Sequence, residues 1–135
     1  MMGGQGTALE IDLDVVKAEV AEAFAGYERA LMGYDPDALD DFFWRDDRAV
    51  RFGIAESLYG HAAIAAYRRT RTTVPQRVLS NTRIVAIGRD AATVNTEFRY
   101  PGDPRVGRQS QVWARLPEGW RVVAAHVSFQ EDVER

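Results

Sequence analysis

The sequence predicts an α+β domain in which three N-terminal helices cover a cone-shaped, curved antiparallel (mixed) sheet. Three observations lead to this fold class. Apolar residues recur every three or four positions through the first part of the chain, and strand-like segments rich in β-branched residues fill the rest. Short turns join those later strands, which must be antiparallel because a parallel return needs a crossover. A strongly curved sheet closed on one side by a long helix leaves an interior pocket.

The first helix is predicted over residues 14–32. Its apolar stripe, which faces the core, comprises Val16, Val20, Phe24, Tyr27, Leu31 and Tyr34. Asp14 can cap the start of this helix, and Gly33 can end it. Asp35 and Pro36 then predict the N-cap and the first residue of a second helix, which ends near Trp44.

A short strand over residues 48–52 and a third helix over residues 61–71 complete the first half of the chain. Arg68, Arg69 and Arg71 form a basic run on that helix, and we expect this run to be a solvated face. The four long strands are predicted at residues 77–87, 92–100, 107–116 and 120–130. The turns between them are rich in Gly, Pro and Asp.

The composition describes one ordinary soluble domain. The chain has 135 residues, of which 46% are hydrophobic and 27% charged, and we expect a single domain over residues 12–131 after a disordered lead-in over residues 1–11. The absence of cysteine excludes disulfides and thiolate chemistry. A net charge of -3 argues against nucleic acid as a partner, and no apolar run is long enough for a membrane span. We therefore expect a soluble cytoplasmic protein.

Tyr27 and Arg51 are the two candidate catalytic residues. Tyr27 is either a core tyrosine bonded to a backbone carbonyl, which its spacing alone favours, or a phenol that points into the pocket as a donor or acid. Arg51 alternates with Val50 and Phe52 and therefore points away from them. It lies either on the surface or inside the cone, where its planar guanidinium would suit a carboxylate.

The segment over residues 107–113 is polar for a strand in the middle of a sheet. Gln109, Gln111 and Trp113 share one face of it, and we predict that they line the pocket and bind the substrate. His126 lies on the last strand opposite Val127, and we assign it to the same binding set, although a lone strand histidine is more often structural.

Cofactor and metal motifs are missing from the sequence. The two histidines, His61 and His126, are far apart and show no metal-ligand spacing, and no GxGxxG, P-loop or GxSxG motif occurs. We expect no cofactor and no metal, so that any chemistry comes from side chains that converge in the pocket.

Three segments are similar to motifs of the AtzH-like family, within the SnoaL-like branch of the nuclear transport factor 2-like superfamily. Residues 50–60 (VRFGIAESLYG) resemble its VRYGxAENxYG segment, residues 107–113 (GRQSQVW) its GRQSQTW segment, and residues 119–128 (GWRVVAAHVS) its GWRIVAAHVS segment. The resemblance covers nearly the whole chain after about residue 12. Phe52 and Ser57 replace the usual tyrosine and asparagine.

The resemblance implies an activity and two key residues. The family includes proteins of oxalurate catabolism and one that breaks down 1,3-dicarboxyurea. It therefore implies that this chain is a cofactor-free decarboxylase or hydrolase of a small anionic, N-carboxylated urea in nitrogen catabolism. It also implies that a tyrosine on the first helix and an arginine in the first strand, here Tyr27 and Arg51, are the key residues. The chemistry of these residue types fits this activity, because Arg51 can hold a substrate carboxylate and Tyr27 can donate toward the nitrogen.

Two other functions stay open. The chain is alternatively a non-catalytic small-molecule-binding or accessory protein of an amidase pathway, because this fold also serves binding proteins. A dehydratase or isomerase is disfavoured, because Glu97 is the only acidic residue within the long strands, apart from their ends. We expect a homodimer formed through the outer face of the strands at about residues 92–129, with a functional link to an amidase.

Overall fold

The computed structural model describes residues 8–131 and confirms the predicted fold class. The helices are α1 (Asp14–Met32), α2 (Pro36–Phe42) and α3 (His61–Arg68), and the strands are β2 (Val50–Phe52), β3 (Ser57–Tyr59), β4 (Val78–Ile87), β5 (Ala91–Arg99), β6 (Gly107–Leu116) and β7 (Gly119–Phe129). They form one six-stranded sheet of order β3-β2-β7-β6-β5-β4. The sheet is mixed, because β2 pairs with β7 in parallel and every other pairing is antiparallel.

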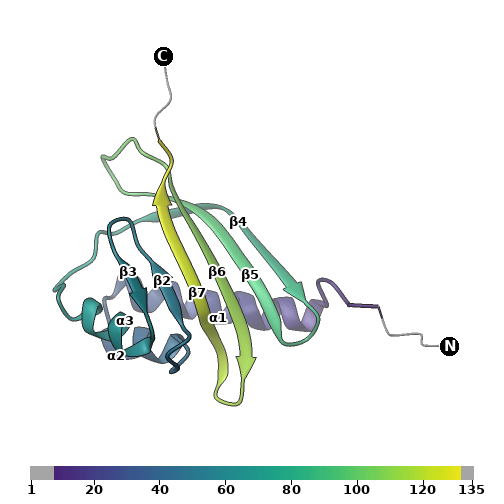
Figure 1. The fold of residues 1–135 in the computed structure, drawn as a ribbon. Helices are drawn as coiled ribbons and strands as arrows, with labels where there is room; N and C mark the ends of the chain where they lie inside the picture. Colours follow the sequence, from purple (N-terminus) through teal and green to yellow (C-terminus); the bar gives the residue numbers. More distant parts are fainter. Residues whose placement is uncertain (1–7, 132–135) are drawn as a thin grey trace.

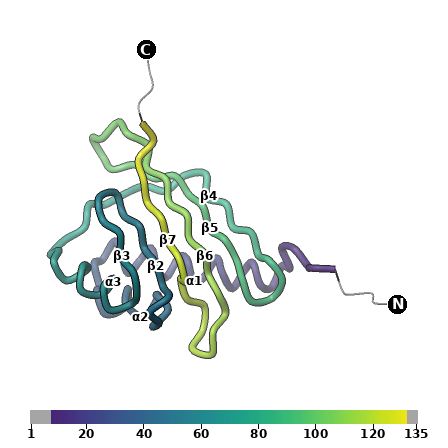
Figure 2. Tube along the Cα trace, in the orientation of Figure 1, coloured from purple at the N-terminus to yellow at the C-terminus, as the bar shows by residue number. Residues whose placement is uncertain are grey.

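The helices lie on the concave side of the sheet. Figure 1 shows α1 crossing behind the long strands, with α2 and α3 at the end of the molecule that carries β2 and β3. The trace in Figure 2 shows how the four long strands curve together around α1. Register shifts between β6 and β7 at Val112/Trp113, and between β4 and β5 at Ser80/Arg83, accompany this bending, because an extra residue in one strand kinks the ladder.

The first two helices begin and end largely as their sequences predict. Gly33 is the C-cap of α1. At α2, the Asp35 side chain accepts a hydrogen bond from the Ala38 N–H, and Pro36 is the first helical residue. Asp14 does not cap α1, because the N-cap position is occupied by Leu13 and makes no side-chain bond.

Two predictions about the middle of the chain were wrong. No strand was predicted between residues 52 and 61, but residues 57–59 form β3 and pair with β2 as a short hairpin. Helix α3 ends at Arg68 rather than at Arg71. Its C-terminal turn is held by the Tyr34 hydroxyl, which donates to the Arg68 carbonyl.

Part of the predicted lead-in over residues 1–11 packs against the sheet. Ile11 forms a bridge with Ile87, and the Gly88 N–H donates to the Glu10 carbonyl over 2.7 Å. The Asp12 carboxylate accepts from the Ala86 N–H, which ties the start of the domain to the edge strand β4. Residues 1–7 of the predicted lead-in lie outside the described residues.

None of the helices between residues 8 and 131 is long and apolar enough to cross a membrane.

Candidate functional site

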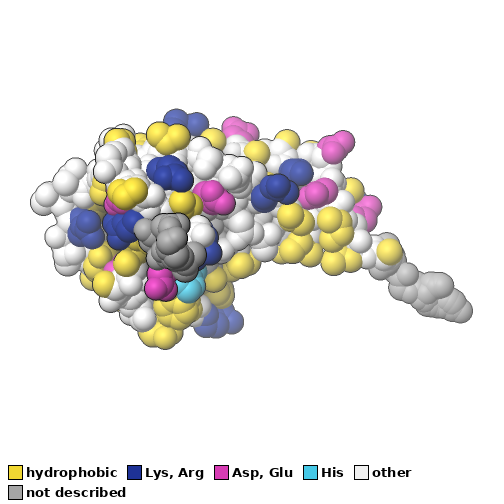
Figure 3. All heavy atoms as spheres, turned by 90° about the horizontal axis from the view of Figure 1, so that it is seen from above, with side chains coloured by type: hydrophobic (Ala, Val, Ile, Leu, Met, Phe, Trp, Pro, Cys, Tyr) yellow, Lys and Arg dark blue, Asp and Glu magenta, His cyan; other side chains and the backbone are white. Residues whose placement is uncertain are grey.

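A cavity of about 390 Å³ lies between the concave face of the sheet and the three helices. Its wall includes Tyr27 of α1, Arg51 of β2, Arg68 of α3, and Gln109 and Gln111 of β6. The lining also includes residues of the β2–β3 hairpin, the connector after α3 and the β5–β6 loop, and we call this side of the cavity its mouth. Viewed from above in Figure 3, Lys and Arg side chains gather at the end of the molecule that carries this mouth.

The floor of the cavity is one row of residues across the sheet. Arg51 of β2 pairs with Ala125 of β7, and Ala125 pairs on its other side with Gln111 of β6. Arg51 and Gln111 therefore stand two strand spacings apart, about 10 Å, with a methyl side chain between them. The small side chain of Ala125 leaves the space in which a ligand can lie between a guanidinium and an amide.

The structure places Arg51 inside the cone, which was one of its two predicted positions. Its Nη1 donates to Glu56 Oε2 over 2.8 Å, and the Tyr67 ring lies beneath its guanidinium. Burial alone would raise the pKa of the Glu56 carboxyl, but the hydrogen bond and charge of Arg51 outweigh it and hold that pKa below its usual value. Glu56 is thus an ionised partner that orients Arg51.

Gly53 makes this ion pair possible. A Cβ at this position would lie 1.8 Å from Glu56 Oε2, so any side chain there would displace the Glu56 carboxylate. The hairpin between β2 and β3 therefore needs glycine for Glu56 to fold back onto Arg51. This explains in physical terms why the segment over residues 50–60 carries arginine, glycine and glutamate at these spacings.

Tyr27 lies at the cavity with its ring buried. The ring contacts Phe42, Phe43 and Trp113, with centroids 6.0–6.3 Å away. The hydroxyl makes no hydrogen bond with any other described residue, and Tyr27 is part of the cavity lining. The phenol is therefore available to a ligand.

Gln109 and Gln111 present N–H groups without partners. The Gln111 carbonyl oxygen accepts from Trp113 Nε1 over 3.0 Å, and the Gln109 carbonyl oxygen accepts from Arg77 Nη1 over 3.1 Å. Because indole and guanidinium groups can only donate, both amides are fixed with their NH2 groups free. Both Nε2 atoms are buried and lack a partner within residues 8–131.

Arg77 serves the cavity by holding Gln109. Its side chain is 4% exposed and makes two hydrogen bonds to Glu28 of α1, over 2.7 and 3.0 Å. Burial would lower the pKa of Arg77, but the Glu28 carboxylate raises it by more, so the net shift is upward. Arg77 therefore stays protonated at the cavity wall, and the carboxylate of Glu28 balances its positive charge.

Two of the predicted binding residues do not line the cavity. Trp113 is fully buried beneath it and holds Gln111 in place. His126 lies on the outer face of the sheet, where it is exposed, pairs with Ser110 and contacts the Phe52 ring at 5.7 Å. The prediction that His126 lines the pocket was wrong, because its cross-strand partners belong to the convex face.

Arg68 was expected on a solvated face, but most of its side chain is withdrawn from solvent. Its side chain is 10% exposed and lines the cavity. A signal for this was present in the sequence, because Arg68 stands four residues after the buried Ile64 and so shares its helix face. Glu56 carried a signal too, since it lies within the segment over residues 50–60.

The lining as a whole favours anions. It contains the arginines Arg51, Arg68, Arg71, Arg77 and Arg105, whereas Glu56 is its only acidic residue within the described part of the chain. No three His, Asp or Glu side chains between residues 8 and 131 cluster as metal ligands would.

Comparison with known proteins agrees with the motifs. The model of the AtzH-like family matches residues 9–133. The chain belongs to the AtzH-like family. No curated protein matches the chain.

Solved structures related to this AtzH-like chain support both family and fold. It is 45% identical to a protein of unknown function from the DUF3225 family of Pectobacterium atrosepticum, with a TM-score of 0.88, over 90% of this chain and 95% of that one. It is also 45% identical to a cystatin-like fold protein of Burkholderia xenovorans, with a TM-score of 0.86, over 90% of this chain and 97% of that one. A nuclear transport factor 2-like superfamily protein of Salmonella enterica is 25% identical, with a TM-score of 0.71, over 89% and 94%. The fold is therefore nuclear transport factor 2-like.

Proposed function

We propose that the protein removes carbon dioxide from a small N-carboxylated urea, such as 1,3-dicarboxyurea, in nitrogen catabolism. The observation that carries this proposal is the donor set of the cavity, in which the amide NH2 groups of Gln109 and Gln111 are fixed inward without partners. Buried donors without partners are costly in the free protein and favour a ligand rich in acceptor oxygens. Carboxylate and urea carbonyl oxygens are such acceptors, and the family resemblance selects this substrate class.

The proposed reaction needs a proton and an electrostatic anchor. The nitrogen of the carbamate group takes a proton, the bond between that nitrogen and the carboxylate carbon breaks, and the electron pair stays on nitrogen while carbon dioxide leaves. Tyr27 donates the proton and regains one from water. Arg51 holds a carboxylate of the substrate by charge-assisted hydrogen bonds and fixes its orientation.

The state of Glu56 favours this reaction over hydrolysis. Hydrolysis requires a base that activates water. Glu56 is the only carboxylate that lines the cavity among residues 8–131, and its Oε2 is held by Arg51 over 2.8 Å. Decarboxylation requires no such base, so the donors of the cavity and the Tyr27 phenol are sufficient for it.

The experiment is a direct measurement of carbon dioxide release from freshly prepared 1,3-dicarboxyurea. The wild-type protein should raise the rate clearly above that of the substrate in buffer alone. Arg51→Ala and Tyr27→Phe should each lower that rate by about 100-fold or more, the size typical of a lost acid or electrostatic group. Arg83→Ala and Tyr59→Phe are the matched controls, because both side chains are exposed outside the cavity lining. Equal rates with and without protein would refute the proposal.

The same donor set also favours a second candidate, a non-catalytic binding or accessory protein of an amidase pathway. Unpartnered donors attract acceptors whether or not a reaction follows. An increase in melting temperature with malonate, together with no release of carbon dioxide above the background, would select this candidate over the enzyme.

We further propose that the protein is a cytoplasmic homodimer that pairs through the outer face of the sheet. Val112 is 40% exposed there and stands beside Ser110 and His126, so the face is only partly polar. Light scattering at micromolar concentration should give twice the monomer mass, and a clean monomer would refute this arrangement.

A further inference from the structure

Among the arginines that line the cavity, Arg68 is the one with buried guanidinium nitrogens that lack a hydrogen-bond partner within the described residues. Its side chain is 10% exposed, its guanidinium lies over the Phe43 ring at 5.4 Å, and its Nη2 is buried without a partner among the described residues. Its Nε stands 3.4 Å from Asp40 Oδ1, close enough for an ion pair, but neither atom has a hydrogen-bond partner within residues 8–131.

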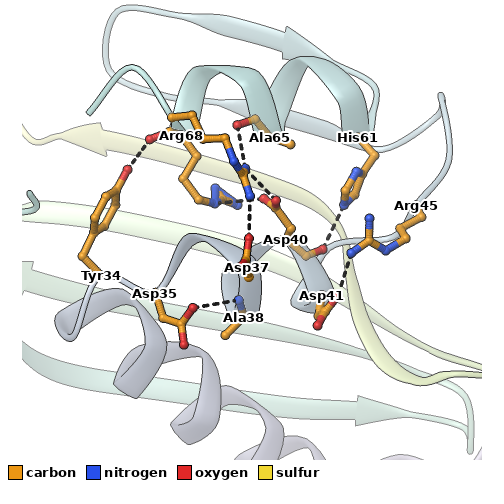
Figure 4. Close-up of polar contacts among 11 residues, drawn as sticks. Tyr34, Asp35, Asp37, Ala38, Asp40, Asp41, Arg45, His61, Ala65 and Arg68 are labelled. Atoms are coloured by element: carbon orange, nitrogen blue, oxygen red, sulfur yellow. Dashed lines mark hydrogen bonds and ion pairs between the residues drawn. The ribbon is translucent and has the colours of Figure 1, made fainter. Parts of the chain in front are cut away.

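Asp40 is an incomplete counterion for Arg68 because it is shared. The other oxygen of its carboxylate, Oδ2, is 2.7 Å from Arg69 Nη1, and Arg69 is held a second time by Asp37 over 2.8 Å. Figure 4 shows α2 below and α3 above, with the Asp37 and Asp40 side chains of α2 turned toward the end of α3 that carries Arg68. One carboxylate therefore serves two guanidinium groups, and the outer one has the shorter contact.

The surroundings of Arg68 confirm that its charge is costly. Burial lowers the pKa of its guanidinium, and the nearby Tyr27 and Asp40 only partly oppose that effect. The positive charge of Arg51 also contributes to the downward shift, so the two arginines repel each other across the cavity. A ligand that brought negative charge between them would remove both penalties.

We infer that Arg68 forms a second anion-binding subsite, so that the cavity takes a small dianion with one carboxylate on Arg51 and the other on Arg68. This subsite rests on the proposed function, because it lies in the same cavity and concerns the same class of substrate. Asp40 is the positioning residue, which holds the Nε side of the fork and leaves Nη2 to the ligand. A monocarboxylate could satisfy only one of the two arginines, so the cavity should prefer a dicarboxylate.

The experiment measures binding of malonate, a stable dicarboxylate, and of acetate, a monocarboxylate, by isothermal titration calorimetry. Wild-type protein should bind malonate much more tightly than acetate. Arg68→Met should weaken malonate binding by about tenfold or more and shrink the difference between the two ligands. Arg68→Lys keeps the charge but loses the planar fork, so it should bind malonate with intermediate affinity.

Arg45→Gln is the matched control. Arg45 pairs with Asp41 rather than Asp40, and its side chain is 59% exposed and lies outside the cavity lining. Its loss should leave malonate affinity within about twofold of wild type. If Arg68→Met does not fold, Arg68→Lys and Arg45→Gln still separate a subsite from a general charge effect.

A structural role for Arg68 predicts different results. It would make Arg68→Met less stable while leaving the malonate affinity of the folded fraction unchanged, and that outcome overturns the inference. So does a wild-type protein that fails to bind malonate. Parallel assays with 1,3-dicarboxyurea separate the two proposals. Malonate binding through Arg68 without carbon dioxide release refutes the proposed function alone, whereas undiminished release by Arg68→Met refutes the subsite alone.

Discussion

The two halves of α1 carry the same apolar stripe, but the first half packs against the core of the sheet and the second half lines the cavity. In the first half, Val16, Val20 and Phe24 are at most 6% exposed and share a buried cluster with Ala92 and Trp113 of the sheet. We call this region the closed end. In the second half, Tyr27 and Leu31 continue the same stripe, but they line the cavity, or open end. An apolar helix face therefore does not by itself specify a packed core.

The difference between the two ends comes from the sheet. At the closed end, the inner face presents aliphatic and aromatic side chains, including Val94, Trp113 and Val122, which are fully buried. At the open end, the same strands present Gln109 and Gln111, with the small Ala125 between them and Arg51. Interiors are normally close-packed, so a cavity persists where side chains are short or where polar groups need a ligand.

The largest expected effect is the loss of the side chain at the boundary between the two ends. Trp113→Ala removes an indole that is fully buried and contacts Tyr27 and Phe42. The free energy of unfolding should fall by about 3–5 kcal/mol, as measured by urea denaturation. Val15→Ala is the control, because its side chain is 62% exposed on α1, and it should change little. A loss below about 1 kcal/mol for Trp113→Ala would show that this region is not closely packed.

Two inward-facing alanines give the sharpest test of the comparison. Ala92 is fully buried opposite Trp113 at the closed end, whereas Ala125 forms the floor of the open end. Ala92→Leu should lower the free energy of unfolding by about 1–3 kcal/mol, because the added methyl groups meet packed side chains. Ala125→Leu should lower it by less than about 1 kcal/mol, because they enter open space, and it should abolish malonate binding.

Both variants are measured by urea denaturation and by calorimetric titration with malonate. Equal destabilisation by the two substitutions would mean that the cavity floor is packed as tightly as the core. Retained malonate binding by Ala125→Leu would mean that the ligand does not lie between Arg51 and Gln111.

A charge placed on the cavity wall should have a smaller effect on stability and a clear effect on binding. Gln111→Glu preserves the acceptor for Trp113 Nε1 but replaces a free NH2 group by a carboxylate oxygen that repels anions. Malonate binding and carbon dioxide release should each fall by about tenfold or more, a loss of about 1.4 kcal/mol. Ser110→Asp, the neighbouring position on the outer face, should leave both unchanged. Unchanged binding by Gln111→Glu would contradict the donor argument.

The sequence predicted those helices and strands whose residues show a local periodicity. The bounds of α1 and β6 follow directly from their periodicities of 3.6 and 2 residues. Strand β3 was missed because three residues cannot display a period, and in its hairpin Glu56 folds over Gly53. To predict where Glu56 folds, one must know where Arg51 points in the folded protein. The alternation of residues in its strand allowed both the surface and the inside of the cone.

The candidate site was harder to predict because it depends on which face of the sheet is concave. Alternation put His126 opposite Val127, but only the register with β6 shows that Val127 faces the cavity and His126 does not. Arg68 was assigned to solvent because arginine runs usually are solvated, although its distance of four residues from Ile64 indicated the buried face. The error at His126 arises from cross-strand partners that alternation does not show, and the error at Arg68 arises because the run of arginines was given more weight than the helical spacing.

The smallest expected effect comes from a comparison of two turns with the same local structure, one at the mouth of the open end and one elsewhere in the molecule. Asp103 and Asp46 each precede an arginine by two residues and accept hydrogen bonds from its backbone and side chain. Side-chain hydrogen bonds from Arg105 and Arg48 respectively lower the pKa of each carboxyl from 3.8 to about 2. A pKa lowered on folding stabilises the protein above the unfolded value, and this stabilisation is lost as the pH falls from about 4 toward 2.

Asp103→Asn and Asp46→Asn should therefore both flatten the pH dependence of unfolding between about pH 4 and 2, as measured by urea denaturation. They should differ in binding at neutral pH. Arg105 lines the cavity mouth and stacks on Phe129 at 3.8 Å, so loss of its counterion in Asp103→Asn leaves a freer positive charge at the entrance. Malonate affinity should then rise by about twofold, a size typical of exposed charges, whereas Asp46→Asn should leave it unchanged. Equal affinities for the two variants would show that the charge at the mouth has no part in attracting the ligand.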